Sequence, residues 1–268
     1  MKTRIISACI MAPLLVLVWL GGLPLFAACL IIAFMGMHEF YAGFRAMGKD
    51  PCIYTGYISA GLLFAAVYLR YFAGRLQGEH FASAVLAWLT VTMVMGLVVS
   101  LIKEDHDVFD GPLGALGALY IGFFCVHVVM TERAFGDLVW LVFLAAFGTD
   151  IMAYFTGYFL GKHKLCPKLS PKKTVEGAVG GVIGSAVFCA VFALIAAPDK
   201  VMSCALAGLI SSPFAQAGDL IASAFKRKMG IKDYGKLIPG HGGIMDRFDS
   251  VLLTAPFIYY VLLMVEPA

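Results

Sequence analysis

The feature that most constrains this chain is a series of long apolar runs, of which the first extends from Ile5 to Met37 without a charged residue. A helix of about 18 or more apolar residues is long enough to cross a bilayer. The first run is too long for one crossing, and Gly21, Gly22 and Pro24 indicate a turn inside it. The chain is 61% hydrophobic and 14% charged, against about 45–50% and about 25% in soluble domains. The sequence therefore predicts an integral membrane protein.

The apolar runs predict an all-α, polytopic membrane protein with about nine transmembrane helices, because each run is close to one bilayer thickness. We expect about five spans in residues 1–135 and about four in the C-terminal region, residues 136–268. The predicted spans are residues 5–20, 23–38, 54–72, 82–102, 113–130, 137–160, 177–197, 201–222 and 250–265.

The basic residues of the connecting segments predict an orientation. Cytoplasmic loops carry an excess of Lys and Arg, and most Lys and Arg residues lie at the N-terminus and in residues 39–53, 161–176 and 223–249. With nine spans these segments share one side, which we expect to be the cytoplasm. Arg70 and Arg75, on the opposing side, weaken the asymmetry without reversing it.

The segment from Ser223 to Ser250 carries the densest set of reactive side chains. Its cations suit phosphate oxygens, its carboxylates suit Mg²⁺, and its glycines allow backbone N–H groups to approach an anion. Each feature also has an ordinary interpretation when taken alone. A basic run after a span usually anchors the helix, aspartates in a first turn complement the helix dipole, and the histidine would be interfacial. Together they favour a site. The charged residues of the segment are Lys226, Arg227, Lys228, Lys232, Asp233, Lys236, Asp246, Arg247 and Asp249, with His241 beside them.

Three acidic residues lie within or at the ends of apolar runs: Glu39, Asp150 and Asp219. A carboxylate in a span costs a few kcal/mol, so it usually has a partner or a function. The alternative for Asp219 is solvation near the interface. On a helix Asp219, Ser223 and Lys226 share one face. We expect Pro213 to kink or interrupt that helix.

A second basic segment extends from Gly161 to Gly177. It is either an anchoring loop or a phosphate clamp formed by Lys172 and Lys173. Ser170 or Thr174 is a candidate cap for the helix that follows. Small residues recur at Gly177, Gly181 and Ser185, and again at Gly114, Ala118 and Gly122. Such faces serve close packing within the chain or, alternatively, a homodimer interface.

These motifs resemble those of the phosphatidate cytidylyltransferases. The signature of that family is similar at Ser223, Phe225, Lys226, Arg227, Lys232, Asp233, Gly235, Ile238, Pro239, His241, Gly242, Gly243, Ile244, Asp246, Arg247, Phe248 and Asp249. A second family stretch is matched at Asp150, Ala153, Tyr154, Ser170, Pro171, Lys172, Lys173, Thr174, Glu176 and Gly177. Met152 is bulkier than the small residue that the resemblance implies there. The resemblance is strong over residues 138–265.

The resemblance implies transfer of CMP from CTP to phosphatidic acid, with release of pyrophosphate. It implies an enzyme of the inner membrane of a bacterium, with the polar site facing the cytoplasm. It also implies Mg²⁺, in one site or with a second cation, and no nucleic-acid partner. The metal ligands would be Asp219, Asp246 and Asp249. The catalytic residues would be Lys226, Arg227, Lys232, Asp233, His241 and Arg247. The substrate-binding residues would be Ser170, Lys172, Lys173, Thr174, Ser223, Gly242 and Gly243.

Two alternatives belong to other classes. The enzymes that use CDP-activated alcohols are identified by the pattern D-G-x₂-A-R…G-x₃-D-x₃-D. This sequence lacks that pattern. An anion transporter would carry its charged residues near the middle of the membrane. Here nearly all of them fall at one predicted surface, which favours the transferase.

Overall fold

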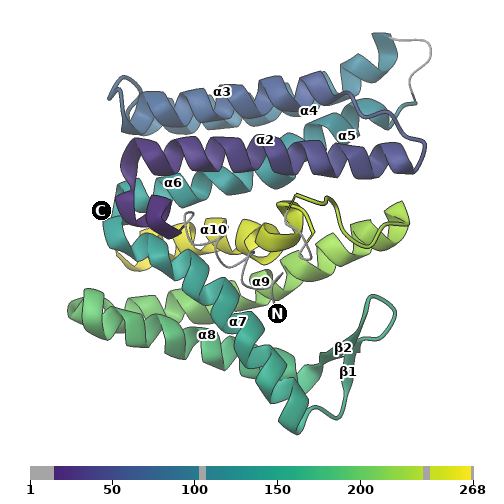
Figure 1. Cartoon of the computed structure of the whole chain (residues 1–268). Helices are drawn as coiled ribbons and strands as arrows, with labels where there is room; N and C mark the ends of the chain where they lie inside the picture. The colour runs from purple at the N-terminus through teal and green to yellow at the C-terminus, as the bar shows by residue number, and fades with distance from the viewer. Residues whose placement is uncertain (1–14, 103–106, 238–241, 267–268) are drawn as a thin grey trace. The chain divides into compact units, whose positions relative to one another are not determined.

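The computed structural model describes residues 15–102, 107–237 and 242–266. Ile238, Pro239 and His241 of the predicted signature lie outside this part of the chain. The all-α prediction is confirmed (Figure 1). The helices are α2 Gly22–Ala46, α3 Ile53–Tyr71, α4 Gly78–Ile102, α5 Asp110–Gly117, α6 Phe123–Phe135, α7 Trp140–Leu160, α8 Val175–Ala196, α9 Val201–Met229 and α10 Met245–Val265. A π-helical turn, η1 (Ala118–Gly122), and two 3₁₀ turns, η2 (Gly136–Val139) and η3 (Pro198–Lys200), complete them.

Seven helical segments of the described chain are long and apolar enough to cross a membrane. The longest, Asp110–Leu160, has 51 residues, which at 1.5 Å per residue is about 77 Å and more than twice the bilayer core. It contains the two spans predicted at 113–130 and 137–160, and η2 lies between them. The first predicted span, 5–20, falls largely outside the described residues. The polytopic class is confirmed, and the count of nine stays a prediction.

The chain forms two compact units, and the first contains Met1–Met130 and Lys228–Asp246. Its core is built on α2, where Met37, Phe40 and Tyr41 are almost fully buried. The Tyr41 hydroxyl donates a hydrogen bond to the carbonyl of Gly114 at 2.7 Å. The small-residue face of α5 and η1 therefore packs inside this unit, since Gly114 lies against the Cys52 backbone and Gly122 against Ala60.

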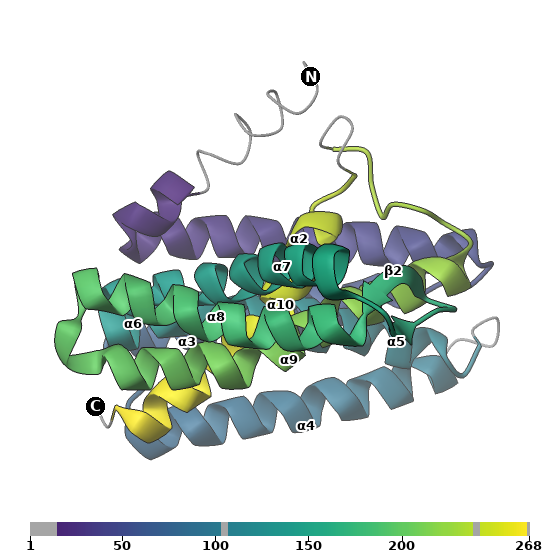
Figure 2. The ribbon, with the colours of Figure 1, turned by 90° about the horizontal axis from the view of Figure 1, so that it is seen from below.

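The second unit contains Thr131–Arg227 and Arg247–Ala268. Its glycine-rich helix α8 lies against α7, because Gly181 faces Ala153 and Thr149, and Gly184 faces Met152. Figures 1 and 2 show α9 side by side with α8, where the Ser185 hydroxyl donates to the Gly208 carbonyl at 3.0 Å. The small-residue face of α8 thus serves packing within the chain, as the first of the two alternatives states.

A short β-hairpin connects α7 and α8, and the sequence patterns did not predict it. Strand β1 (Lys164–Cys166) pairs antiparallel with β2 (Ser170–Thr174). The Thr174 hydroxyl accepts the Gly177 N–H at 3.1 Å and caps α8. The predicted cap is confirmed at Thr174. The hairpin leads the basic segment directly into the first turn of α8.

Helix α9 continues through Pro213 from Val201 to Met229. The helix is not interrupted at this proline, so that alternative is wrong, and the kink stays a prediction. Prolines are tolerated in membrane helices because neighbouring groups satisfy the backbone carbonyl that the missing N–H leaves unpaired. The continuous helix keeps Asp219, Ser223 and Lys226 on one face, as the spacing predicts.

Candidate active site

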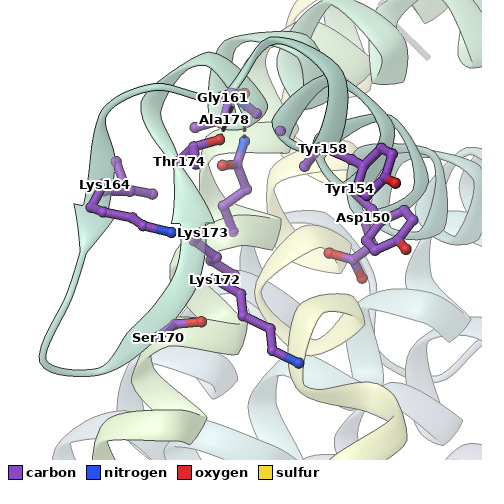
Figure 3. Close-up of a pocket in the computed structure, with 15 residues that line it drawn as sticks. Asp150, Tyr154, Tyr158, Gly161, Lys164, Ser170, Lys172, Lys173, Thr174 and Ala178 are labelled. Carbon is purple, nitrogen blue, oxygen red and sulfur yellow. Dashed lines mark hydrogen bonds between the residues drawn. The ribbon is translucent and has the colours of Figure 1, made fainter.

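A cavity of about 540 Å³ lies in the second unit, between α7, the β-hairpin and the start of α8. Figure 3 shows its labelled lining: Asp150, Tyr154 and Tyr158 come from α7, and the lysines come from the hairpin. Gln216 of α9 closes another wall, where its amide donates to the Ala178 carbonyl at 3.1 Å. A concave pocket with a few convergent polar groups is the usual form of a small-molecule site.

Lys173 extends from β2 to Asp219 of α9, and the two form an ion pair. Their side chains are 25% and 32% exposed, so the pair is partly shielded from water. Lys164, Lys172 and Ser170 line the same cavity. The structure thus brings Ser170, Lys172 and Lys173, three of the predicted substrate-binding residues, together at one pocket. Thr174 also lines it, although its hydroxyl is used as the helix cap.

Three carboxylates of this unit influence one another electrostatically: Asp150, Asp219 and Asp249. Asp150 accepts a hydrogen bond from the Ser250 hydroxyl at 3.3 Å, and Asp249 accepts the Ser250 N–H at 2.8 Å. Lys226 interacts with Asp249 as well. Asp150 was not among the predicted metal ligands, although its position within an apolar run had marked it as unusual.

Hard carboxylate oxygens of this kind suit Mg²⁺. In the described chain, however, no group of three or more His, Cys, Asp or Glu side chains has the geometry to hold a metal ion. Instead the Lys173 ammonium is the cation beside Asp219. The donor chemistry of the carboxylates fits a divalent cation, and the Lys173 ammonium occupies one of the two Asp219 oxygens.

The signature loop, Gly230–Ile244, belongs to the first unit, and Asp246 holds it closed. One Asp246 carboxylate oxygen accepts the N–H of Tyr234 at 2.8 Å and that of Gly243 at 2.9 Å. Gly242 has a φ of 85° beside this carboxylate, a conformation that favours glycine. The Gly243 N–H, predicted to contact phosphate, is thus engaged with Asp246 in this structure.

Glu39 of α2 is the second anchor of the signature loop. Its two carboxylate oxygens accept the N–H groups of Ile244 and Met245, each at 3.0 Å. Gly235 and Gly243 pack so closely on this carboxylate that a Cβ at either position would collide with it. The sequence marked Glu39 only as an acid at the end of a span, and nothing local links it to residues more than 200 positions away.

The remaining predicted residues vary in exposure. Lys226 is half-buried on α9, whereas Arg227, Lys232 and Asp233 are exposed. The Arg247 Nε atom is buried and, within the described residues, has no hydrogen-bond partner, so its N–H can still donate to a ligand. Ser223 lies one turn after Asp219 on α9. His241 lies outside the described residues.

The fold and these side chains define a polytopic helical membrane protein with a basic and acidic pocket suited to phosphorylated ligands. The sequence profile of the Cytidylyltransferase family matches residues 2–265. The chain therefore belongs to that family.

Three bacterial relatives illustrate the similarity, and each is called a phosphatidate cytidylyltransferase. The protein of Bacillus subtilis is 34% identical over 184 residues, which cover 67% of this chain and 65% of the relative, slightly under two thirds of its length. That of Staphylococcus saprophyticus is 33% identical over 265 residues, 98% of each chain. That of Synechocystis is 33% identical over 285 residues, 98% of this chain and 97% of the relative.

Proposed function

We infer that this chain is a phosphatidate cytidylyltransferase, which transfers CMP from CTP to phosphatidic acid to give CDP-diacylglycerol and pyrophosphate. The observation that carries the inference is the pocket of the second unit, where hairpin lysines meet a membrane-helix aspartate. The family membership and the names of the full-length relatives support the same reaction.

The reaction needs charge compensation more than proton transfer. The phosphate of phosphatidic acid has a second pKa of about 6, so it is largely an oxyanion at neutral pH. One of its oxygens attacks the α-phosphorus of CTP, the bond from that phosphorus to the bridging oxygen breaks, and pyrophosphate leaves with the electron pair. Two polyanions must approach each other in line. Lysine and arginine side chains reduce their repulsion without acting as bases.

We assign the pocket of the second unit to the CTP phosphates. Lys172 and Lys173 would hold them, with the Ser170 hydroxyl as a further donor, since all three line the pocket. Lys173 would exchange its contact with Asp219 for a phosphate oxygen. Lys226, Arg227, Lys232 and Arg247 would compensate further phosphate charge, and Ser223 would contact substrate. The roles of Asp233, His241, Thr174, Gly242 and Gly243 stay predictions from the signature.

Mg²⁺ is the proposed cofactor, in one site or with a second cation. Asp219 and Asp249 are its proposed ligands in the second unit, and Asp246 stays a ligand by sequence. A bound divalent ion would supply neutralisation of the charge that develops on the phosphate oxygens.

The helices place this protein in a membrane, and we propose the inner membrane of a bacterium with the site facing the cytoplasm. The basic loops support that orientation by the positive-inside rule. A homodimer also stays a proposal. Both small-residue faces that suggested it are used for packing within their own units, so a dimer would need another surface.

The test is turnover of the purified protein in detergent with CTP and phosphatidic acid, with and without Mg²⁺. We expect CDP-diacylglycerol and pyrophosphate in equal amounts, and no product after chelation. A protein that releases no pyrophosphate from CTP in the presence of phosphatidic acid and Mg²⁺ would refute the proposed function. Product formation that persists after chelation would refute only the proposed Mg²⁺ requirement.

A further inference from the structure

Helices α2 and α3 of the first unit carry two adjoining cavities that no predicted site residue explains. One, of about 610 Å³, is lined by His38, Tyr57 and, from the signature loop, Lys236 and Leu237. The other, of about 590 Å³, has an apolar and aromatic lining that includes Phe26, Leu30 and Tyr68. Phe34 lines both of them. We call the two together the Phe34 groove.

The apolar part of the Phe34 groove matches one leaflet of a bilayer. On α2 the whole lining extends from Phe26 to Ala42, about 24 Å at 1.5 Å per residue, and its apolar part, from Phe26 to Met35, is about 14 Å long. Half of the hydrocarbon core is about 15 Å. Since α2 and α3 are both apolar enough to cross the membrane, a groove of this length along them suits one extended acyl chain.

Only one end of the Phe34 groove carries charge. Lys236 and His38 are exposed there, and an ammonium group is a good partner for a phosphate oxygen. The acidic group at this end is Glu39, whose two oxygens accept the N–H groups of Ile244 and Met245, at the start of α10. The positive end of the helix dipole offsets its charge. The groove therefore combines a cationic end with an apolar body.

We propose that the Phe34 groove binds the lipid substrate, with the phosphate of phosphatidic acid at Lys236 and one acyl chain along α2 and α3. This assignment rests on the proposed function and names the lipid subsite of the same enzyme. Charge complementarity and the leaflet length select a phospholipid over a soluble phosphate, which would leave the apolar body of the groove empty.

Gly61 offers a specific way to block the groove. It lines the apolar cavity, and a Cβ built on it has no neighbour within 4 Å. Glycine is about 1 kcal/mol less favourable than alanine inside a helix, and tryptophan lies between the two. Gly61→Trp should therefore fill the groove without disturbing α3. Ala65→Trp, at an exposed residue of the same cavity, is the second blocking variant.

The readout is the KM for phosphatidic acids of different chain length, measured at saturating CTP. With Gly61→Trp we expect the KM for the dipalmitoyl lipid to rise about tenfold, while that for the dihexanoyl lipid and the KM for CTP stay at wild-type values. The matched control is Leu62→Trp, which adds the same ring at the next, 57% exposed residue outside the groove. Lys236→Met should raise the KM for both lipids.

If both blocking variants have the same kinetics as Leu62→Trp for both lipids, the groove assignment is wrong. The groove would then hold only loosely bound bilayer lipid and not the substrate. That result leaves the proposed function intact, since the wild-type protein would still turn over. A wild-type protein that fails to use either lipid would instead refute the proposed function. If Gly61→Trp loses helix content or no longer elutes as a single species, it is misfolded. The same kinetic comparison is then made with Ala65→Trp.

Discussion

The two basic segments of this chain are each fastened by one glutamate, and the two glutamates come from very different places in the sequence. In the hairpin segment, Glu176 accepts the backbone N–H groups of Lys162 and His163, 14 and 13 residues away. In the signature loop, Glu39 accepts those of Ile244 and Met245, 205 and 206 residues away. Both carboxylates therefore hold two consecutive N–H groups.

The surroundings of the two contacts differ as well. The hairpin has a strand pairing and the Thr174 cap in addition to Glu176, and its contacts to Glu176 are exposed. The described part of the signature loop contains no strand, only a single β-bridge residue at Gly242, and its contacts to Glu39 are part-buried. Charge-assisted hydrogen bonds are stronger when shielded from water. The signature loop also has its own Asp246 contacts. We still expect it to depend more on Glu39 than the hairpin depends on Glu176.

The largest effect is expected at Asp246, which closes the signature loop. Asp246→Asn keeps a carbonyl oxygen that can accept both N–H groups, so the loop should keep its fold while the charge is lost. Turnover should fall more than about 100-fold, because a missing metal ligand costs several kcal/mol in the transition state. Product formation is the measurement. Turnover within about threefold of wild type would remove Asp246 from the metal site.

Glu39→Gln tests the distant anchor directly. Glutamine presents one acceptor and one donor, so the N–H of Ile244 or of Met245 would face another N–H. Leaving a buried group unpaired costs about 1–3 kcal/mol. We expect kcat to fall about tenfold with smaller changes in KM, together with faster tryptic cleavage after Lys232 or Lys236.

Glu79→Gln, an acidic residue in the first turn of α4, serves as the matched control for Glu39→Gln. Glu39→Asp, whose shorter side chain keeps the charge, should recover less than full activity. Unchanged kinetics and unchanged proteolysis in Glu39→Gln would show that the loop does not depend on this anchor.

Lys173→Ala should have an intermediate effect in the other segment. It leaves Asp219 without the cation beside it and removes a proposed phosphate contact. We expect the KM for CTP to rise about tenfold, and Lys172→Ala, at a lysine with no ion pair among the described residues, to have a smaller effect. Lys168→Ala, in the exposed turn of the hairpin, is the control. If all three variants have the same kcat and KM for CTP, the segment serves only as a membrane anchor.

The smallest effect is expected for Glu176→Gln. Its contacts are exposed, where ion pairs contribute about 0–1 kcal/mol, and the strand pairing and helix cap remain. Turnover should stay within about threefold of wild type, which is less than 1 kcal/mol. A loss as large as that of Glu39→Gln would contradict the difference between the two segments.

Local patterns predicted much of this molecule. Apolar runs of bilayer length gave the helices from α2 to α10, because each needs only its own residues. The spacing of Asp219, Ser223 and Lys226 placed them on one helical face, and Thr174 was a candidate cap. These predictions depend on neighbours in the sequence, which is why they could be made from the chain alone.

Contacts between distant residues were not accessible in this way. The pairing of Lys173 with Asp219 required the hairpin, whose strands are too short to give a clear alternating pattern. The attachment of Ile244 to Glu39 required knowing which helix lies beside the loop. The continuity of α9 through Pro213 depended on its membrane surroundings. Each of these depends on tertiary structure.

The contact between Met152 and Gly184 has a consequence for the evolution of this protein. Met152 fills the space that the missing side chain of Gly184 leaves on α8, and a Cβ there would collide with it. The order of substitutions is therefore constrained. Because the Cβ of residue 152 is itself among the atoms that a Cβ at residue 184 would meet, shortening Met152 to alanine does not make room. A lineage can enlarge residue 184 only after residue 152 has become glycine or α7 and α8 have moved apart. An alanine at 184 that is neutral in such an ancestor would be harmful in a descendant that carries methionine at 152.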